Sequence, residues 1–408
     1  MKRIPAAVAA MVALLFTLPP AYAQQASGIL DAVKSGQPEL SFRPRYEWAD
    51  DDAFAQDARG LTLRTLAGWR TLPYRGFEGR VLLGSSVQLI DDFNDGHNGK
   101  TQYPFSNTPE ETDFTEAYVR WRGVDGLAVT AGRQKLDLDR TRFVGPNEFR
   151  QTQRWYNGAS ATIDRLPAWN FFLAHFVRER GPDTRQRELR LEVARASYEW
   201  TAGHTLLGSA YLHDQARAIP GTSFADLSYR ILSLRADGRV PLDTRRTLIY
   251  TAEYGEQRPY ADGDDRIRAP YTRVALGGTW TDFRFSANYE RLGSNSGIYG
   301  MQTPLGLLHP SQGWADKFNI TPLKGVRDGW VTAGYKFGKW DFYTEVHRFG
   351  SDVGDIDYGR EVDLRLDWNM RRNLQMRTEL ADFRAADDPG NVLTNATRLW
   401  MTVFWAIY

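Results

Sequence analysis

The amino-acid sequence predicts an all-β protein, a transmembrane antiparallel β-barrel of about 18 strands with short periplasmic turns and long extracellular loops. Three observations predict this fold. An export leader opens the chain, apolar residues then recur at every second position in segments of about 10 to 12 residues, and the connections between these segments alternate between short and long.

The leader occupies residues 1–23. Lys2 and Arg3 form a basic start, residues 6–18 are apolar, and Ala21-Tyr22-Ala23 fits a small-x-small cleavage site. An uncleaved anchor is the alternative, but the apolar stretch is shorter than the ~20 residues that span a bilayer. We therefore expect a signal peptide.

Cleavage there gives a mature chain that begins at Gln24. We expect residues 24–37 to form a periplasmic N-terminal segment and residues 38–408 to form the barrel. This places the protein in the outer membrane of a Gram-negative cell, in contact with its lipids and lipopolysaccharide.

The alternation is clear in a segment near the C-terminus, where Val362, Leu364, Leu366 and Trp368 alternate with charged residues. One face of such a strand suits lipid and the other suits water. The expected strands lie near 38–48, 60–70, 77–90, 113–122, 127–135, 155–164, 168–179, 188–200, 205–214, 226–237, 246–256, 270–281, 282–292, 329–338, 340–349, 360–370, 373–384 and 395–408.

The connections alternate in length, as they do when both termini lie on the short-turn side of an even-stranded barrel. Tight turns are expected at 123–126, 166–168, 201–203, 281–282, 338–339 and 370–373, where Gly, Pro, Asp or Asn occurs. Longer connections fall near 49–59, 91–112, 136–154, 180–187, 215–225, 257–269, 293–328, 350–359 and 385–394. The last strand ends on the aromatic residue Tyr408.

A barrel of this size leaves an aqueous lumen, whereas ~8 strands are filled by their own side chains. Many arginines fall on the polar phase that should face this lumen: Arg43, Arg45, Arg64, Arg80, Arg120, Arg122, Arg133, Arg230, Arg273, Arg284, Arg365 and Arg377. Carboxylates share that face, so these arginines either form an ion-pair ladder that stiffens the wall or, where unpaired, attract anions.

One segment carries a family resemblance. Residues 132–160 read GRQKLDLDRTRFVGPNEFRQTQRWYNGAS, and they resemble the alginate export family of outer-membrane proteins in Gly132-Arg133-Gln134, in Arg142-Phe143 followed by Gly145, and in Arg150-Gln151 followed by Gly158. Tyr156 and Asn157 depart from the Phe and Asp expected before that last glycine. The resemblance implies an 18-stranded barrel whose Arg-lined constriction lets an acidic polysaccharide leave the periplasm.

The candidate solute-binding residues follow from this segment and from the polar phase. Arg133 ends a strand, while the Gly145-Pro146 turn could fold the following connection inward. Converging guanidinium groups would bind carboxylates bidentately. In the alternative interpretation, these arginines pair with Asp137, Asp139 and Glu148. No net positive electrostatic field then remains to attract anions. The candidates are Arg133, Gln134, Arg142, Arg150, Arg154, Arg120, Arg80 and Arg365.

Two features of the loops suggest further roles. The connection 293–328 is far longer than ~15 residues, a length at which loops are usually functional or disordered, and we expect it to fold over or into the mouth as a gate, with disorder as the alternative. Acidic groups at 91–95, 262–265 and 352–357 could bind Ca²⁺, although solvated loop tips are the more ordinary explanation.

Other classes of protein are disfavoured. Without Lys2 and Arg3 the chain has 49 basic and 50 acidic residues, so nucleic acid is not an expected partner. There is no cysteine, no His-Glu-x-x-His and no Gly-x-Ser-x-Gly, and we expect no enzyme activity, metal or cofactor. The expected function is a passive channel for anionic solutes, most of all export of a polysaccharide such as alginate with periplasmic export machinery as a possible partner. The alternatives are an uptake porin for small solutes and, less favoured, an outer-membrane hydrolase.

Overall fold

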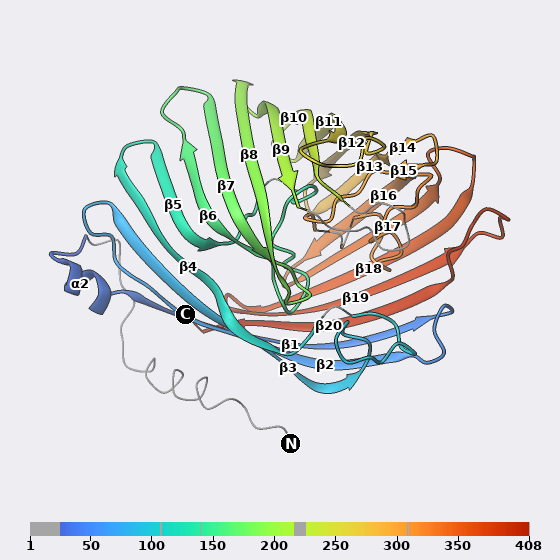
Figure 1. Ribbon diagram of the computed structural model, residues 1–408, viewed down its shortest axis with the longest axis horizontal. Helices are drawn as coiled ribbons and strands as arrows, with labels where there is room; N and C mark the ends of the chain where they lie inside the picture. The colour runs from blue at the N-terminus through green and yellow to red at the C-terminus, as the bar shows by residue number, and fades with distance from the viewer. Residues whose placement is uncertain are drawn as a thin grey trace.

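The computed structural model describes residues 25–106, 108–138, 140–215, 226–307, 309 and 311–407. Within these residues, 18 strands form one closed antiparallel sheet (Figure 1). The expected leader 1–23, Gln24, Asp139 and the terminal Tyr408 lie outside the described residues. The predicted fold class is confirmed.

Each barrel strand pairs with the next along the chain, and the last pairs with the first. The strands are β1 (Gln37–Asp51), β2 (Ala58–Arg70), β3 (Phe77–Asp92), β4 (Glu111–Val124), β5 (Leu127–Gln134), β6 (Trp155–Ile163), β7 (Trp169–Arg180), β8 (Gln186–Thr201), β9 (His204–Asp214), β10 (Tyr229–Pro241), β11 (Arg246–Pro259), β12 (Ala269–Trp280), β13 (Phe283–Leu292), β16 (Val326–Phe337), β17 (Trp340–Gly350), β18 (Asp357–Arg371), β19 (Leu374–Ala385) and β20 (Ala396–Ala406).

The outer face of β18 is apolar along the middle of the strand. On β18, Val362 and Trp368 are 39% and 37% exposed, whereas the intervening Asp363 is fully buried on the inner face. From Arg360 to Trp368 the strand runs roughly 27 Å at ~3.4 Å per residue, which matches an apolar band of about 25 Å. The two-residue period of the sequence is therefore the lipid-facing and lumen-facing alternation of a membrane barrel.

Both described ends of the chain lie at the short-turn end of the barrel (Figure 1). Helix α2 (Ile29–Lys34) packs there, because the Leu72 backbone N–H donates to the Ala32 carbonyl and the Trp69 indole donates to the Val33 carbonyl. The Ile407 N–H donates to the Leu40 carbonyl at the same end. None of the helices in the described part of the chain could cross a bilayer.

One residue predicted to face the lumen does not do so. Arg230 lies on the same face of β10 as Leu232 and Leu234, which are 53% and 55% exposed, while Ile231 between them is buried inside. The strand begins above the apolar band, where the outer face of a barrel is charged, so a polar residue there does not identify the lumenal phase.

Two of the long connections fold into the barrel instead of standing above it. We call residues 135–154 loop L3 and residues 293–325 loop L7. L7 holds a small hairpin of β14 (Ser294–Asn295) and β15 (Tyr299–Gly300). Phe143 and Val144 of L3 pack with Met301 and Leu305 of L7 against the inner wall in one buried cluster. The barrel therefore has a core inside its lumen.

Candidate functional site

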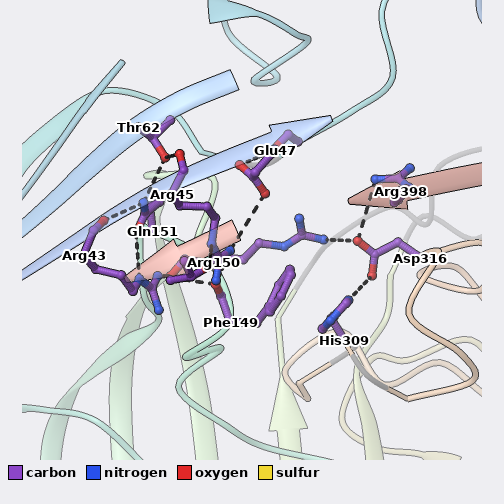
Figure 2. Close-up of polar contacts among 12 residues, drawn as sticks. Arg43, Arg45, Glu47, Thr62, Phe149, Arg150, Gln151, His309, Asp316 and Arg398 are labelled. Carbon is purple, nitrogen blue, oxygen red and sulfur yellow. Dashed lines mark hydrogen bonds and ion pairs between the residues drawn. The ribbon is translucent and has the colours of Figure 1, made fainter. Parts of the chain in front are cut away.

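L3 is fastened to the inner wall by two arginines of β1. The Arg43 guanidinium donates from Nε to Gln151 Oε1 at 2.8 Å and from Nη1 to the Glu148 carbonyl at 2.7 Å. Arg45 donates from Nη1 to the Phe149 carbonyl at 2.7 Å, and its guanidinium lies 4.4 Å from the centre of the Phe149 ring. Figure 2 shows both arginines reaching from β1 to this segment. Both guanidinium groups donate hydrogen bonds to carbonyl oxygens of L3. They therefore hold L3 in place and do not face the open lumen.

The same segment of L3 meets L7 on its other side, at a contact we call the loop junction: Phe149, Arg150, His309 and Asp316. Arg150 Nη2 donates to Asp316 Oδ2 at 2.7 Å, and His309 Nδ1 lies 3.2 Å from Asp316 Oδ1 (Figure 2). The Phe149 and His309 rings stack with their centres 3.5 Å apart. Burial by itself would raise the pKa of Asp316, but Arg150 and then His309 outweigh it and hold this pKa far below its usual value of 3.8.

A second set of contacts joins the two loops further along. Arg142 donates to Glu290 of β13 at 3.0 Å, to Thr303 at 3.0 Å and to Gln312 at 2.8 Å, the last two in L7. The Gly145 N–H donates to the Leu305 carbonyl, and the Leu307 N–H donates to the Thr141 carbonyl. The loops are thus hydrogen-bonded to each other and to the wall, which fixes their positions inside the barrel.

Three of the predicted arginines lie at these loop contacts. Arg142 and Arg150 do so as described, and Arg154 donates to the Pro304 carbonyl at 2.8 Å and lies 3.3 Å from Glu179. Each has an acidic partner, but these partners are Glu290, Asp316 and Glu179, far away in the sequence. Glu148, expected as a partner, instead pairs with Lys135 at 2.7 Å.

The other candidates are not brought together with them. Arg133 lies 3.3 Å from Asp113 and 3.7 Å from the centre of the Trp155 ring, and Gln134 accepts from Ser160 at 2.7 Å. The remaining three are distributed over other parts of the wall, where Arg80 pairs with Glu39 and Glu116, Arg120 donates to Thr130, and Arg365 pairs with Asp367.

A cavity of about 350 Å³ remains between the loops and the wall. Arg140 of L3 and Arg273 of β12 line it. The other lining residues include Glu290, Glu345, His347, Trp330, Ser286 and Asn288. Arg140 donates to Asp237 at 3.0 Å, and the Arg273 guanidinium lies 5.1 Å from the centre of the Trp330 ring. Such a cavity can hold one small molecule by a carboxylate and by hydroxyl groups.

Sequence reasoning missed Arg140, because it lies in a loop next to Asp139. The alternation that assigns strand residues to the lumen does not extend to this loop. Sequence reasoning also passed over a buried group on β17 and β18 that contains His347, because no helical metal-binding spacing marks it.

A larger hollow, of about 530 Å³, is lined by residues that include Leu173 and Leu212 of the lipid-facing phase and is not part of the lumen.

The acidic loops proposed for Ca²⁺ use their carboxylates internally. Asp95 accepts the N–H groups of His97 and Asn98, Asp264 accepts from Arg266, and Asp352 pairs with Arg291.

Comparison with known proteins shows the fold. No family model matches the sequence, and no curated protein is similar to it. Among solved structures, OccK9 (OpdG) of Pseudomonas aeruginosa has a TM-score of 0.72 at 12% identity, covering 92% of this chain and 99% of that one. The outer membrane protein OpdK of the same organism has a TM-score of 0.70 at 12% identity over 92% and 99%. OccAB1 of Acinetobacter baumannii has a TM-score of 0.68 at 14% identity over 95% and 100%.

These similarities support an outer-membrane channel architecture but no finer assignment. The likeness of residues 132–160 to the alginate export family stays a resemblance, since no family model matches the chain. The described residues form a closed β-barrel of 18 strands with the fold of these outer-membrane channels.

Proposed function

We propose that the protein is a passive outer-membrane channel for the uptake of small solutes that carry an anionic group. The observation that carries this proposal is the cavity of about 350 Å³ between L3, L7 and the wall, which is lined by the guanidinium groups of Arg140 and Arg273. That volume lies at the lower end of the range for small-molecule sites. A guanidinium group binds a carboxylate bidentately, which favours an acid over a neutral molecule of the same size.

Export of an acidic polysaccharide is the second candidate, and the resemblance of residues 132–160 to the alginate export family favours it. The loop contacts count against it. A polymer would have to pass where Arg142 and Arg150 tie L3 to L7, whereas a small acid needs only the space that is already present. Fixed loops therefore support solute selection more than polymer passage.

The proposal is tested with the purified protein in liposomes and in planar bilayers. Glucuronate and glucose have nearly the same size, so a faster flux of glucuronate isolates the effect of charge. Arg140→Gln and Arg273→Gln should each weaken glucuronate binding about tenfold to a hundredfold, because a hydrogen bond to a charged group contributes ~1.5–3 kcal/mol. Arg245→Gln, in an exposed turn at the opposite end of the barrel, is the matched control.

Equal fluxes of glucose and glucuronate in the unaltered protein would contradict the proposal. Passage of long uronate oligomers at rates close to that of the monomer would favour polysaccharide export instead. Block of the current by short oligomers without their passage would agree with a site for small acids.

A further inference from the structure

A group of ionisable side chains lies on the inner wall behind the cavity, on three neighbouring strands. It consists of Asp328 on β16, Glu345 and His347 on β17, and Glu361 and Asp363 on β18, and each is buried. Glu345 stands directly opposite Asp363 in the sheet, and His347 stands opposite Glu361. Two short motifs, Glu-x-His and Glu-x-Asp, therefore project side by side to the same inner face.

Three of these side chains bring one ligand atom each to a common point. His347 Nε2 lies 3.3 Å from Glu345 Oε2 and 3.5 Å from Asp363 Oδ2, and the three ligand atoms lie within 4.8 Å of one another. Ligand atoms bound to a tetrahedral Zn²⁺ are about 3.3 Å apart, given bonds of ~2.0–2.1 Å. The two distances from His347 Nε2 are close to this separation.

The surroundings orient these atoms as metal ligands are usually oriented. His347 Nδ1 lies 3.0 Å from Asp328 Oδ1, an arrangement in which Nδ1–H donates and leaves the Nε2 lone pair directed at the other two carboxylates. Glu345 accepts from the Trp314 indole at 3.0 Å and from the Tyr343 hydroxyl at 2.5 Å, which fixes its carboxylate. A lone pair that faces two carboxylates is repelled unless a cation or a proton lies between them.

Two carboxylates of the group lack the donors that buried anions need. Among the described residues, backbone N–H groups donate to Glu361 Oε1 only, and none donates to Glu361 Oε2 or to either oxygen of Asp363. The Asp363 carboxylate has only His347 Nε2, at 3.5 Å, and the carboxyl group of Glu361 as polar neighbours. Even with a doubly protonated His347, four carboxylates against one imidazolium leave a formal charge of −3. A buried charge of that size requires compensation by a bound cation or by protons.

L7 closes over the group and approaches it at a glycine. The backbone N–H groups of Trp314 and Ala315 both donate to Glu361 Oε1, the latter at 2.7 Å. Gly313 has φ +79°, and a Cβ at this position would lie 2.5 Å from Glu361 Oε2. Glycine thus leaves space beside the unpartnered oxygen. The cavity of about 350 Å³ reaches Glu345 and His347 and gives an ion a path from the lumen.

We propose that His347, Glu345 and Asp363 form a binding site for a divalent transition-metal ion of the Zn²⁺ type, with Glu361 Oε2 beside it and Asp328 orienting the imidazole. One nitrogen and several carboxylate oxygens suit Zn²⁺ better than Ca²⁺ or Mg²⁺, which take oxygen ligands. The bound ion would fix L7 against the wall, since Trp314 donates to two of the carboxylates. The site borders the cavity proposed for the solute, but its metal binding can be measured without any solute.

The test uses the full protein, folded in detergent and stripped with a chelator. Zn²⁺ uptake is measured by isothermal titration and by metal analysis after dialysis, and Co²⁺ serves as a spectroscopic substitute. We expect one equivalent of Zn²⁺, a nitrogen-plus-oxygen environment by X-ray absorption, and at least tenfold weaker binding of Ca²⁺. Asp363→Asn and His347→Gln should each weaken Zn²⁺ binding by more than tenfold, and Asp328→Asn should do so by about 10- to 100-fold.

Two controls separate the site from general effects. His175→Gln removes an exposed histidine of β7 and should leave binding unchanged. Migration in unboiled detergent gels reports whether each variant is folded, and Asp363→Asn keeps the size of the side chain if His347→Gln does not fold.

The proposal fails if the folded, unaltered protein takes up no stoichiometric Zn²⁺, or if folded Asp363→Asn binds it as the unaltered protein does. It also fails if infrared spectra show a protonated carboxyl that is lost in Asp363→Asn and persists when Zn²⁺ is added, since Glu361 and Asp363 would then be compensated by a shared proton.

Discussion

Replacing Asp316 with Asn should open the loop junction. In the unaltered protein, Asp316 and Arg150 are 2% and 8% exposed at their side chains and lie 2.7 Å apart. The amide keeps the shape of the side chain but removes its charge, so the buried guanidinium of Arg150 loses its counterion. Breaking a buried pair by removing one partner costs about 3–5 kcal/mol.

This cost falls on the closed arrangement of the loops, because an open L3 returns Arg150 to water. At 1.4 kcal/mol per factor of ten, the ratio of closed to open loops should fall roughly a hundredfold to a few thousandfold. Single-channel recordings of Asp316→Asn should therefore show a larger conductance, or frequent transitions to a larger level.

The matched control is Asp264→Asn, which removes a carboxylate paired with Arg266 in another loop, where both groups are solvent-accessible. We expect it to leave conductance unchanged, as exposed pairs contribute little. If folded Asp316→Asn had the conductance and current noise of the unaltered protein, the loop junction would not control the width of the passage.

Other predictions follow from the same contacts. Deleting residues 294–323 should raise conductance, since L7 lies inside the barrel; unchanged conductance would mean that L7 does not restrict the pore. Because the pKa of Asp316 is lowered, its pairing stabilises the closed loops above the unfolded-state pKa near 3.8 and is lost only as the pH falls through the lower folded-state value. Conductance should thus be the same at pH 7 and pH 4, and an opening near pH 5 would show that another group controls the loops. Arg142→Gln leaves Glu290 without its closest guanidinium and should lower the free energy of unfolding by about 3–5 kcal/mol in a urea titration; a change below 1 kcal/mol would show that Arg273, at 3.7 Å, compensates. The unboiled protein should migrate anomalously in detergent gels and be found in the outer-membrane fraction, whereas recovery from the soluble periplasm would contradict the barrel.

The strands could be predicted because lipid and water impose a local pattern. Val362 and Asp363 are adjacent in the chain and lie on opposite faces of the sheet, so a window of ten residues identifies such a strand. The expected strand at 360–370 is observed as Asp357–Arg371, and the expected one at 226–237 as Tyr229–Pro241. The ends of the strands were harder to predict, because the strands continue above the apolar band. The alternation of apolar and polar residues stops there.

The candidate site could be predicted only in part. The sequence pointed to Arg142, Arg150 and Arg154 and to an inward fold of their loop, but it suggested neighbouring carboxylates as partners. The actual partners, Asp316 and Glu290, come from segments 166 and 148 residues away. Such pairs depend on how two loops pack inside a closed sheet, and no local pattern records that packing.

The loop junction also lies at the seam where the sheet closes on itself. Arg45 of β1 donates both to the Phe149 carbonyl of L3 and to Thr402 of β20, and Arg398 of β20 lies 3.9 Å from Asp316 of L7. The first and last strands therefore share their inner contacts with both loops. During assembly, β1 and β20 meet only after nearly the whole chain has been synthesised, and until then each presents an unpaired edge. L3 and L7 contact both β1 and β20 from inside the barrel. These contacts stabilise the pairing of the first and last strands and so keep the barrel closed.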